Sequence, residues 1–395
     1  MATNKVSFKE HYILMLGHMA DDLSQGALPA ILTMLYLKGS LESFTQIATL
    51  ILATTIVNAL AQPLTGYFAD KKSRPYIMTL GMLLAAIGVM FLCFIDNIYL
   101  MIVSVAISGI GIALFHPSAG KIANALALKK VGRAMSIFSV GGNIGFALGP
   151  LYFAFFYQFF DIYATLTLIL PAFIMALVFS FKNKHYVKSL EHLTHKLKSI
   201  DAKAQDNIKG MGILLLLVFA RSAAMFSLTA FLPLYFIQML DVQESVSTLS
   251  ITVFALSGAL ATLLGGTLSD KFGFTKLVQV SSLLTLPCIL LFLISHNIYL
   301  SLASLIPLAI FYYAGMSPIV VIGQKLLPHH VGMATGITIG LGVSFGGIVA
   351  PLIAKIGDNY GIYYVMLTIA IILLIAFLIS LFVPRITGDK DLKKA

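Results

Sequence analysis

The sequence predicts an all-α integral membrane protein with twelve transmembrane helices in two six-helix pseudo-repeats. Three observations predict it: the composition, twelve long apolar segments, and an internal repeat. Of the 395 residues, 59 % are hydrophobic and 11 % are charged, whereas a soluble domain is about 45–50 % apolar and about 25 % charged. This composition excludes a water-soluble globular enzyme and a disordered chain, and the two cysteines exclude a disulfide scaffold.

Twelve segments are apolar enough and long enough to cross a bilayer as helices, which takes about twenty residues each. They are residues 10–37, 44–69, 76–95, 98–123, 134–157, 162–181, 211–239, 246–269, 276–295, 298–323, 332–356 and 362–383. Short polar breaks separate them. The chain is therefore predicted to cross the membrane an even number of times, with both ends on the same side.

The basic residues orient these helices. Of the 26 Lys and Arg residues, 23 fall in the breaks and ends on one side, and only Lys38 and Lys355 fall on the other. Because cytoplasmic loops carry an excess of Lys and Arg, both termini are predicted to be cytoplasmic. The net charge of +10 then belongs to these loops, and no nucleic-acid partner is expected.

The longest polar stretch divides the chain. Residues 1–181 are predicted to form an N-terminal six-helix bundle and residues 211–395 a C-terminal one, joined by a cytoplasmic linker over residues 182–210. Within the linker, apolar residues recur at helical spacing among lysines, which predicts an amphipathic helix on the inner leaflet. These residues are Val187, Leu190, Leu193, Leu197 and Ile200. A solvated linker is the alternative.

The two halves repeat with an offset of 200 residues. The matches are Asn97-Ile98-Tyr99-Leu100 with Asn297-Ile298-Tyr299-Leu300, Gly66-x-x-x-Asp70-Lys71 with Gly266-x-x-x-Asp270-Lys271, Val131-Gly132 with Val331-Gly332, and Ala59-Leu60-Ala61 with Ala259-Leu260-Ala261. Four matches at one offset indicate two related six-helix units. Parallel repeats of this kind, with a site between them near the membrane midplane, are a transporter architecture.

Residues 66–74 resemble the loop signature of the major facilitator superfamily through Gly66, Asp70, Lys71 and Arg74, with Ser73 in place of the usual glycine. Small residues let helices approach closely, and an Asp can hold basic residues or a helix N-terminus in a contact that differs between two conformations. A simple basic loop is the alternative, and the second copy at Gly266, Asp270 and Lys271 argues against it.

A second motif, Gly145-x-x-x-Gly149-Pro150, resembles the glycine–proline motif of exporters in this superfamily. Gly and Pro permit tight packing and a bend. Ser136 stands where the longer form of the motif has another glycine. The alternative is ordinary packing of small residues, which occurs in many membrane helices.

Ionisable residues within the membrane are costly and usually functional. The first segment carries His18, Asp21 and Asp22, and the seventh carries Arg221, which is the repeat partner of Asp21. Repeat-related helices face each other across the cavity of this architecture, so these carboxylates and Arg221 are expected to approach near the midplane. The alternative is a fixed ion pair that holds the halves together.

Other polar residues lie within the predicted helices. His116, followed by Pro117, can donate, accept or carry a proton, or can simply be a packing residue. Secondary cavity candidates, for which ordinary interhelix hydrogen bonding is the alternative, are Asn58, Gln62, Asn143 and Gln324. The sequence spacing reveals no metal-ligand set and no phosphate-binding GxxxxGK[ST] motif, so no metal, cofactor or ATP-driven step is predicted.

A narrower resemblance covers several of these residues. The stretch from Gly17 to Ala30, the run Phe115-His116-Pro117, Arg221-Ser222 and Gln324-x-x-Leu327-Pro328 resemble the fosmidomycin-resistance branch of the superfamily. The acidic position of that branch falls on Asp22. The resemblance implies a monomeric, non-enzymatic efflux protein of the bacterial inner membrane, driven by protons, for the phosphonate antibiotic fosmidomycin or related organic anions.

The predicted roles follow from the chemistry. Arg221 offers a fork of donors suited to a phosphonate, Asp22 would carry the proton with Asp21 as second choice, and His18 and His116 would tune that carboxyl or contact substrate. If Asp22 paired with Arg221, however, protonation would free the Arg for an anion and favour symport. Proton-coupled uptake or exchange of an organic anion is therefore the alternative, and a non-transporting membrane receptor a remote one.

Overall fold

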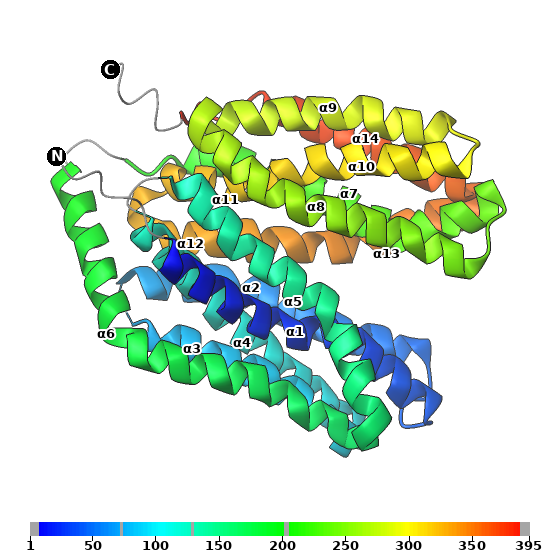
Figure 1. Cartoon of the computed structure of the whole chain (residues 1–395), viewed down its shortest axis with the longest axis horizontal. Helices are drawn as coiled ribbons and strands as arrows, with labels where there is room; N and C mark the ends of the chain where they lie inside the picture. The colour runs from blue at the N-terminus through cyan, green and yellow to red at the C-terminus, as the bar shows by residue number, and fades with distance from the viewer. Residues whose placement is uncertain (1–7, 72–73, 128–129, 201–204, 388–395) are drawn as a thin grey trace. The chain divides into compact units, whose positions relative to one another are not determined.

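The computed structural model describes residues 8–71, 74–127, 130–200 and 205–387, and these ranges contain helices and no strand (Figure 1). The chain divides into two compact units. Unit 1 comprises residues 1–129, 137–206 and 328–341, and unit 2 comprises residues 130–136, 207–327 and 342–395. Each unit includes a short piece of chain from the other half of the sequence, residues 328–341 in unit 1 and residues 130–136 in unit 2. The predicted bundle boundaries at residues 181 and 211 stay predictions.

Unit 1 holds the N-terminal helices. They are α1 (Lys9–Leu37), α2 (Phe44–Lys71), α3 (Tyr76–Met90), η1 (Leu92–Phe94), α4 (Ile98–Leu126), α5 (Val131–Phe160) from residue 137 onward, η2 (Asp161–Leu168) and α6 (Ile169–Ile200), together with η3 (Pro328–His330), α12 (Val331–Thr335) and the π-helix η4 (Gly336–Leu341). Their core includes Leu23 and Ile31 of α1 and Val105 of α4. The polar residues of α1 thus lie on a helix whose C-terminal half packs into this core.

Unit 2 holds the remaining helices. They are α7 (Ile208–Leu240), α8 (Glu244–Phe272), α9 (Phe274–Ile294), α10 (Ile298–Ala314), α11 (Met316–Leu326), α13 (Gly342–Tyr360) and α14 (Ile362–Ser380), and the first turn of α5. A buried aromatic cluster that contains Tyr235, Phe254 and Phe292 forms part of the core.

Ten helical stretches of the described ranges are long and apolar enough to span a membrane. One of them, residues 131–192, contains both the fifth and the sixth predicted segments. The first predicted segment forms α1, but its His, Asp and Gln residues lower its hydropathy below that of the other spans. The all-helical membrane fold is therefore confirmed.

Three predicted segments have a different local structure. The tenth segment is broken at Gly315 into α10 and α11, and the eleventh is divided into α12, the π-helix η4 and α13. Helix α6 runs on to Ile200, so most of the predicted linker is helical. In that stretch Leu190 is buried, whereas the side chains of Leu193, Leu197 and Ile200 lie outside the described part, and the inner-leaflet placement stays a prediction.

The repeated Asn-Ile-Tyr-Leu motif has a local explanation. The Oδ1 atom of Asn97 accepts from the backbone N–H groups of Tyr99 and Leu100 at 2.9 and 3.3 Å, and Asn297 makes the same two contacts at the start of α10, at 2.9 and 3.2 Å. The first N–H groups of a helix have no partner within it, and an Asn at the N-cap supplies one. Both copies therefore begin a helix.

Replacing this cap is expected to lower stability modestly. Asn97→Ala should cost about 1 kcal/mol, because two N–H groups lose their acceptor. Thermal unfolding in detergent measures it. Asn97→Ser keeps a capping oxygen and should restore most of the loss. Equal unfolding temperatures for Asn97→Ala and the unmodified chain would contradict a capping role.

Candidate functional site

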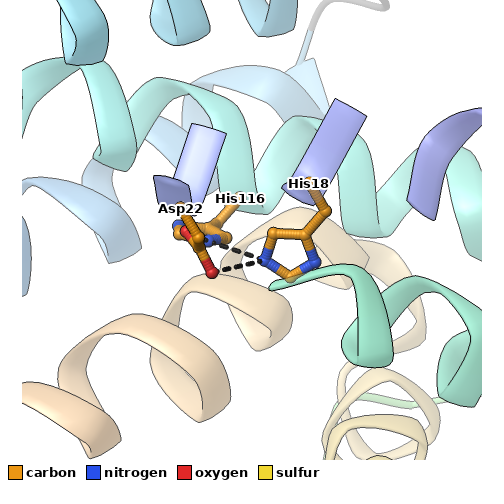
Figure 2. A group of neighbouring side chains, drawn as sticks. All are labelled: His18, Asp22 and His116. Atoms are coloured by element: carbon orange, nitrogen blue, oxygen red, sulfur yellow. Dashed lines mark hydrogen bonds and ion pairs between the residues drawn. The ribbon is translucent and has the colours of Figure 1, made fainter. Parts of the chain in front are cut away.

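Helices α1 and α4 bring three ionisable side chains together inside unit 1 (Figure 2). The Nε2 atom of His18 lies 3.3 Å from Asp22 Oδ2, and the Nε2 atom of His116 lies 3.2 Å from Asp22 Oδ1. The two Nε2 atoms are 3.0 Å apart. Both imidazoles are about 95 % buried. We call these three residues the His–Asp–His cluster.

Local structure explains two of the three members of the cluster. His18 and Asp22 are four residues apart on α1, so they share one face of the helix. His116 follows 98 residues later and precedes Pro117 within α4. The sequence predicts the first pair through its helical spacing, whereas only the packing of α4 beside α1 adds His116.

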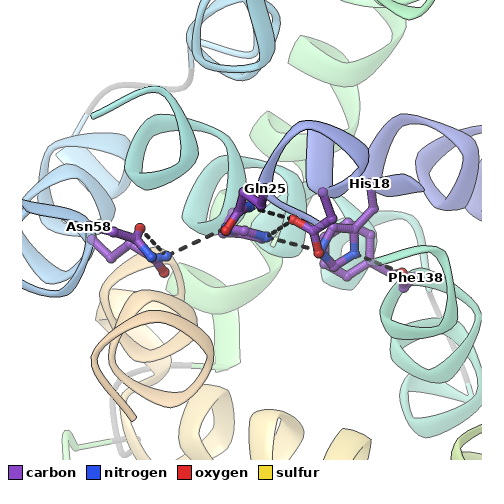
Figure 3. Close-up of polar contacts among 7 residues, drawn as sticks. His18, Gln25, Asn58 and Phe138 are labelled. Atoms are coloured by element: carbon purple, nitrogen blue, oxygen red, sulfur yellow. Dashed lines mark hydrogen bonds and ion pairs between the residues drawn. The ribbon is translucent and has the colours of Figure 1, made fainter. Parts of the chain in front are cut away.

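Further polar side chains surround the cluster (Figure 3). Gln25 Nε2 donates to Asp22 Oδ1 at 2.7 Å. Gln62 of α2 donates to Asn58 Oδ1 at 2.7 Å and lies 3.5 Å from His116 Nδ1. The structure therefore joins two secondary candidates, Asn58 and Gln62, to the cluster.

One hydrogen bond assigns the tautomer of His18. Its Nδ1 atom lies 2.8 Å from the backbone oxygen of Phe138. A carbonyl oxygen only accepts, so Nδ1 carries a hydrogen. The ring of Phe138 also stacks on His18, at 4.2 Å between centroids. The imidazole is thereby held with Nε2 directed at Asp22 and His116.

Glycines of α5 allow it to lie close against α1. A Cβ atom at Gly141, Gly145 or Gly149 would clash with backbone atoms of α1. A Cβ atom at Gly142 would lie 2.5 Å from both Asp22 Oδ2 and His18 Nε2. The predicted motif at Gly145, Gly149 and Pro150 thus extends back to Gly141, and its neighbour Gly142 borders the His–Asp–His cluster.

Asp21 lies apart from these contacts. Its side chain is 1 % exposed, and neither carboxylate oxygen has a hydrogen-bond partner among the described residues. Burying an ionised carboxylate without partners is costly. The two adjacent acids of α1 therefore have different surroundings, although the sequence does not distinguish them.

Arg221 lies buried in unit 2. It donates to the backbone oxygen of Tyr312 and to Ser282 Oγ, the latter at 3.3 Å. Its guanidinium carbon lies 4.3 Å from the centre of the Tyr312 ring, and its Nε atom has no partner among the described residues. Its expected approach to Asp21 and Asp22 joins residues of two units and stays a prediction.

The remaining cavity candidates lie elsewhere. Gln324 is buried in α11 of unit 2. Asn143 is half-buried on α5, next to Gly142. The binding roles of both residues stay predictions.

The repeated Asp residues of the loop signature bind helix N-termini. Asp70 accepts from the N–H groups of Gly332 and Met333, both at 2.9 Å, within unit 1. In unit 2, Asp270 accepts from Gly132 at 2.8 Å and from Arg133 at 2.9 Å. The repeated Asp and the repeated Val-Gly are therefore the two sides of one contact, made twice.

Close approach at these contacts requires glycine. A Cβ atom at Gly66 would lie 2.5 Å from the backbone oxygen of Gly332, and one at Gly266 would clash with Gly132. The glycine and the aspartate of each signature thus serve the same helix–helix contact, four residues apart.

The basic partner of Asp70 comes from α4 and not from the loop signature itself. Lys121 Nζ lies 3.0 Å from Asp70 Oδ1 and donates to the backbone oxygen of Ala69, also at 3.0 Å. Lys71 instead lies over the Tyr67 ring, and Arg74 is exposed. Lys121 lies near the end of α4, which continues to Leu126, and it is outside the loop signature at residues 66–74.

Comparisons with known proteins agree with this architecture. The Major Facilitator Superfamily profile matches residues 14–338 and 214–395. The chain is 28 % identical over 374 residues to the fosmidomycin resistance protein of Escherichia coli strain K12, covering 93 % of this chain and 91 % of that one. It is 29 % identical over 364 residues to an uncharacterized MFS-type transporter of Bacillus subtilis strain 168, covering 91 % and 88 %.

Solved structures show the same fold at low identity. The fucose:proton symporter of E. coli matches with a TM-score of 0.74 and 15 % identity, over 95 % of this chain and 97 % of that one. The human organic anion transporter MFSD10 matches with a TM-score of 0.71 and 15 % identity, over 96 % and 100 %.

Proposed function

The chain belongs to the major facilitator superfamily, and we propose that it exports small organic anions, first among them phosphonates such as fosmidomycin, in exchange for protons. Membership makes it a multi-pass membrane protein and a secondary transporter of small molecules, not an enzyme. The similarity to the fosmidomycin resistance protein of E. coli supports the substrate class. The direction of transport and the coupling ion are part of the proposal.

The observation that carries proton coupling is the His–Asp–His cluster. In the neutral cluster, Gln62 donates to His116 Nδ1, so the ring hydrogen of His116 lies on Nε2. That N–H group can donate to His18 Nε2 or to Asp22 Oδ1. The contact between His18 Nε2 and Asp22 Oδ2 at 3.3 Å then joins two lone pairs. One added proton turns it into a hydrogen bond, so the cluster is built to take up and release a proton.

Arg221 supports the anion site. A buried guanidinium with an unpartnered Nε–H has donors available for a phosphonate. The groups that accept from Arg221 are the hydroxyl of Ser282 and the backbone carbonyl of Tyr312, and both are neutral. An anionic ligand can take their place without competing with a carboxylate for these hydrogen bonds.

The symport alternative depends on a direct pair between Asp22 and Arg221. In the structure, Asp22 has His18, His116 and Gln25 as partners. These partners all lie within unit 1, so they can support proton uptake by Asp22 without Arg221. Proton-coupled uptake or exchange of an organic anion remains the second candidate function.

The setting of the proposal is the bacterial inner membrane. Both termini would be cytoplasmic, from the distribution of Lys and Arg. The protein would work as a monomer, with the membrane and protons as its partners besides the substrate. Export of an anion also gains about 2.3 kcal/mol per charge for each 100 mV of an inside-negative potential.

Fosmidomycin flux in proteoliposomes with an imposed pH gradient tests the proposal. Arg221→Ala is expected to weaken apparent affinity roughly 10- to 150-fold, the equivalent of about 1.5–3 kcal/mol for hydrogen bonds to a charged group. Arg221→Lys keeps the positive charge but loses the paired donors of the guanidinium, so its apparent affinity should lie between those of Arg221→Ala and the unmodified chain. A folded unmodified chain that moves no fosmidomycin in either direction would overturn the substrate. Unchanged affinity in Arg221→Ala would overturn the role of the arginine.

A further inference from the structure

We infer that His18, Asp22 and His116 also form a binding site for one divalent transition-metal ion, with Zn²⁺ as the best match. The inference does not rest on the proposed transport activity, because it concerns binding alone. It rests on the positions of the donor atoms, on the hydrogen bonds behind them, and on the chemistry of the donor set.

The donor atoms have the spacing of a metal site. The two Nε2 atoms are 3.0 Å apart, His116 Nε2 lies 3.2 Å from Asp22 Oδ1, and His18 Nε2 lies 3.3 Å from the other carboxylate oxygen, Oδ2. One donor atom from each residue lies within 4.8 Å of the other two. Zn²⁺ binds His nitrogen and carboxylate oxygen at about 2.0–2.2 Å, usually as a tetrahedron, so adjacent donors lie about 3.3 Å apart. An ion placed between the two imidazoles and the carboxylate reaches all three groups once a rotation of the Asp22 side chain brings one of its oxygens toward both Nε2 atoms.

The hydrogen bonds behind the ligands suit the same role. A metal-ligating His normally donates its other ring N–H to a carbonyl or carboxylate. His18 already does so, from Nδ1 to the backbone oxygen of Phe138 at 2.8 Å. This bond leaves Nε2 directed at the cluster with a lone pair in the neutral ring.

His116 has an acceptor within reach for the corresponding bond. Gln62 is 1 % exposed, and its Oε1 atom has no hydrogen-bond partner among the described residues. Its Nε2 atom lies 3.5 Å from His116 Nδ1. Turning the amides of Gln62 and Asn58 over together would place Gln62 Oε1 there and let Asn58 donate to it. Oε1 would then accept from His116 Nδ1–H and leave His116 Nε2 to bind the ion.

The donor set selects a class of metal. Two neutral imidazoles and one carboxylate carry a single negative charge, and three such protein ligands leave a fourth position for water or substrate in zinc sites. Imidazole suits Zn²⁺ and its transition-metal neighbours, whereas Mg²⁺ and Ca²⁺ prefer oxygen donors. The bare backbone of Gly142 borders the ligands, where a side chain would press on Asp22 and His18.

Zinc binding to the purified, tag-free full chain tests the inference. Equilibrium dialysis against Zn²⁺ at fixed neutral pH is expected to give one ion per chain, with Mg²⁺ unable to compete. His116→Ala and His18→Ala should each weaken binding at least tenfold. The matched control is His329→Ala with His330→Ala, because that pair also contacts a carboxylate, Asp206. Loss of Zn²⁺ binding in the control but not in His116→Ala would overturn the inference.

A gain of signal covers the case in which the alanine variants fail to fold. Co²⁺ bound to the unmodified chain should show the absorption of a four-coordinate nitrogen and oxygen site. His116→Cys should bind Co²⁺ and add a thiolate-to-cobalt charge-transfer band. Neither native cysteine lies in the cluster, since Cys93 is on η1 and Cys288 on α9. Co²⁺ binding by this variant without the band, or no Co²⁺ binding by the unmodified chain, would overturn the assignment.

Discussion

Asp22→Asn is expected to reduce proton-driven transport to the level of protein-free liposomes while substrate exchange continues. The amide keeps the size of the carboxyl group and can still bond to Gln25, but it cannot take up or release a proton. The His–Asp–His cluster then no longer couples its charge to the cycle. Gradient-driven flux and counterflow of labelled substrate, measured on the same vesicles, separate coupling from movement.

Asp358→Asn is the matched control, because Asp358 is an exposed acid near the end of α13, and it should transport like the unmodified chain. Asp21→Asn distinguishes the two acids of α1. If Asp21→Asn removes gradient-driven flux and Asp22→Asn retains it, the proton role moves from Asp22 to Asp21.

Lys121→Met is expected to destabilise the protein by about 3–5 kcal/mol, the usual cost of leaving one partner of a buried ion pair uncompensated. Lys121 and Asp70 have side chains only 9 % and 5 % exposed. Asp70 also accepts from the N-terminus of α12, which replaces part of the lost attraction. Thermal and denaturant unfolding in detergent measure the loss.

Combining Lys121→Met with Asp70→Asn should recover part of that stability, because neither charge is then buried alone. Lys71→Met is the control, since Lys71 lies exposed over the Tyr67 ring, and it should change stability by less than about 0.5 kcal/mol. A Lys121→Met effect no larger than that of Lys71→Met would show that the loop signature does not depend on the buried lysine.

The candidate site was partly readable from local spacing. His18 and Asp22 share a face of α1 at four residues apart, and both residue types are rare in membrane helices. Lys121 was missed because it lies outside the loop signature, about fifty residues further along the chain, and only the packing of α4 against α2 brings it to Asp70. Gly142 was missed because a glycine in a membrane helix predicts close packing but does not identify the residues that pack against it. Packing against α1 decides that.

The divisions within segments were also not readable. The run of apolar residues shows only that a segment is long enough to cross the membrane. A helix that is broken at Gly315, or that is wound locally as a π-helix, has the same apolar composition as a regular helix. A Cβ atom at Gly336 or Gly340 would meet Gln62. The π-helix therefore packs against the residue that bonds to His116.

The sequence by itself determined the helical membrane class, the internal repeat and the list of polar residues that the membrane must accommodate. These features depend on composition and on spacing along one helix, which the chain carries locally. Only the tertiary structure decided which polar residues meet. It placed His116 beside Asp22, Lys121 beside Asp70, and the repeated Asp residues on the repeated Val-Gly helix starts. Such contacts join distant parts of the chain, and their geometry follows from how the helices pack against one another.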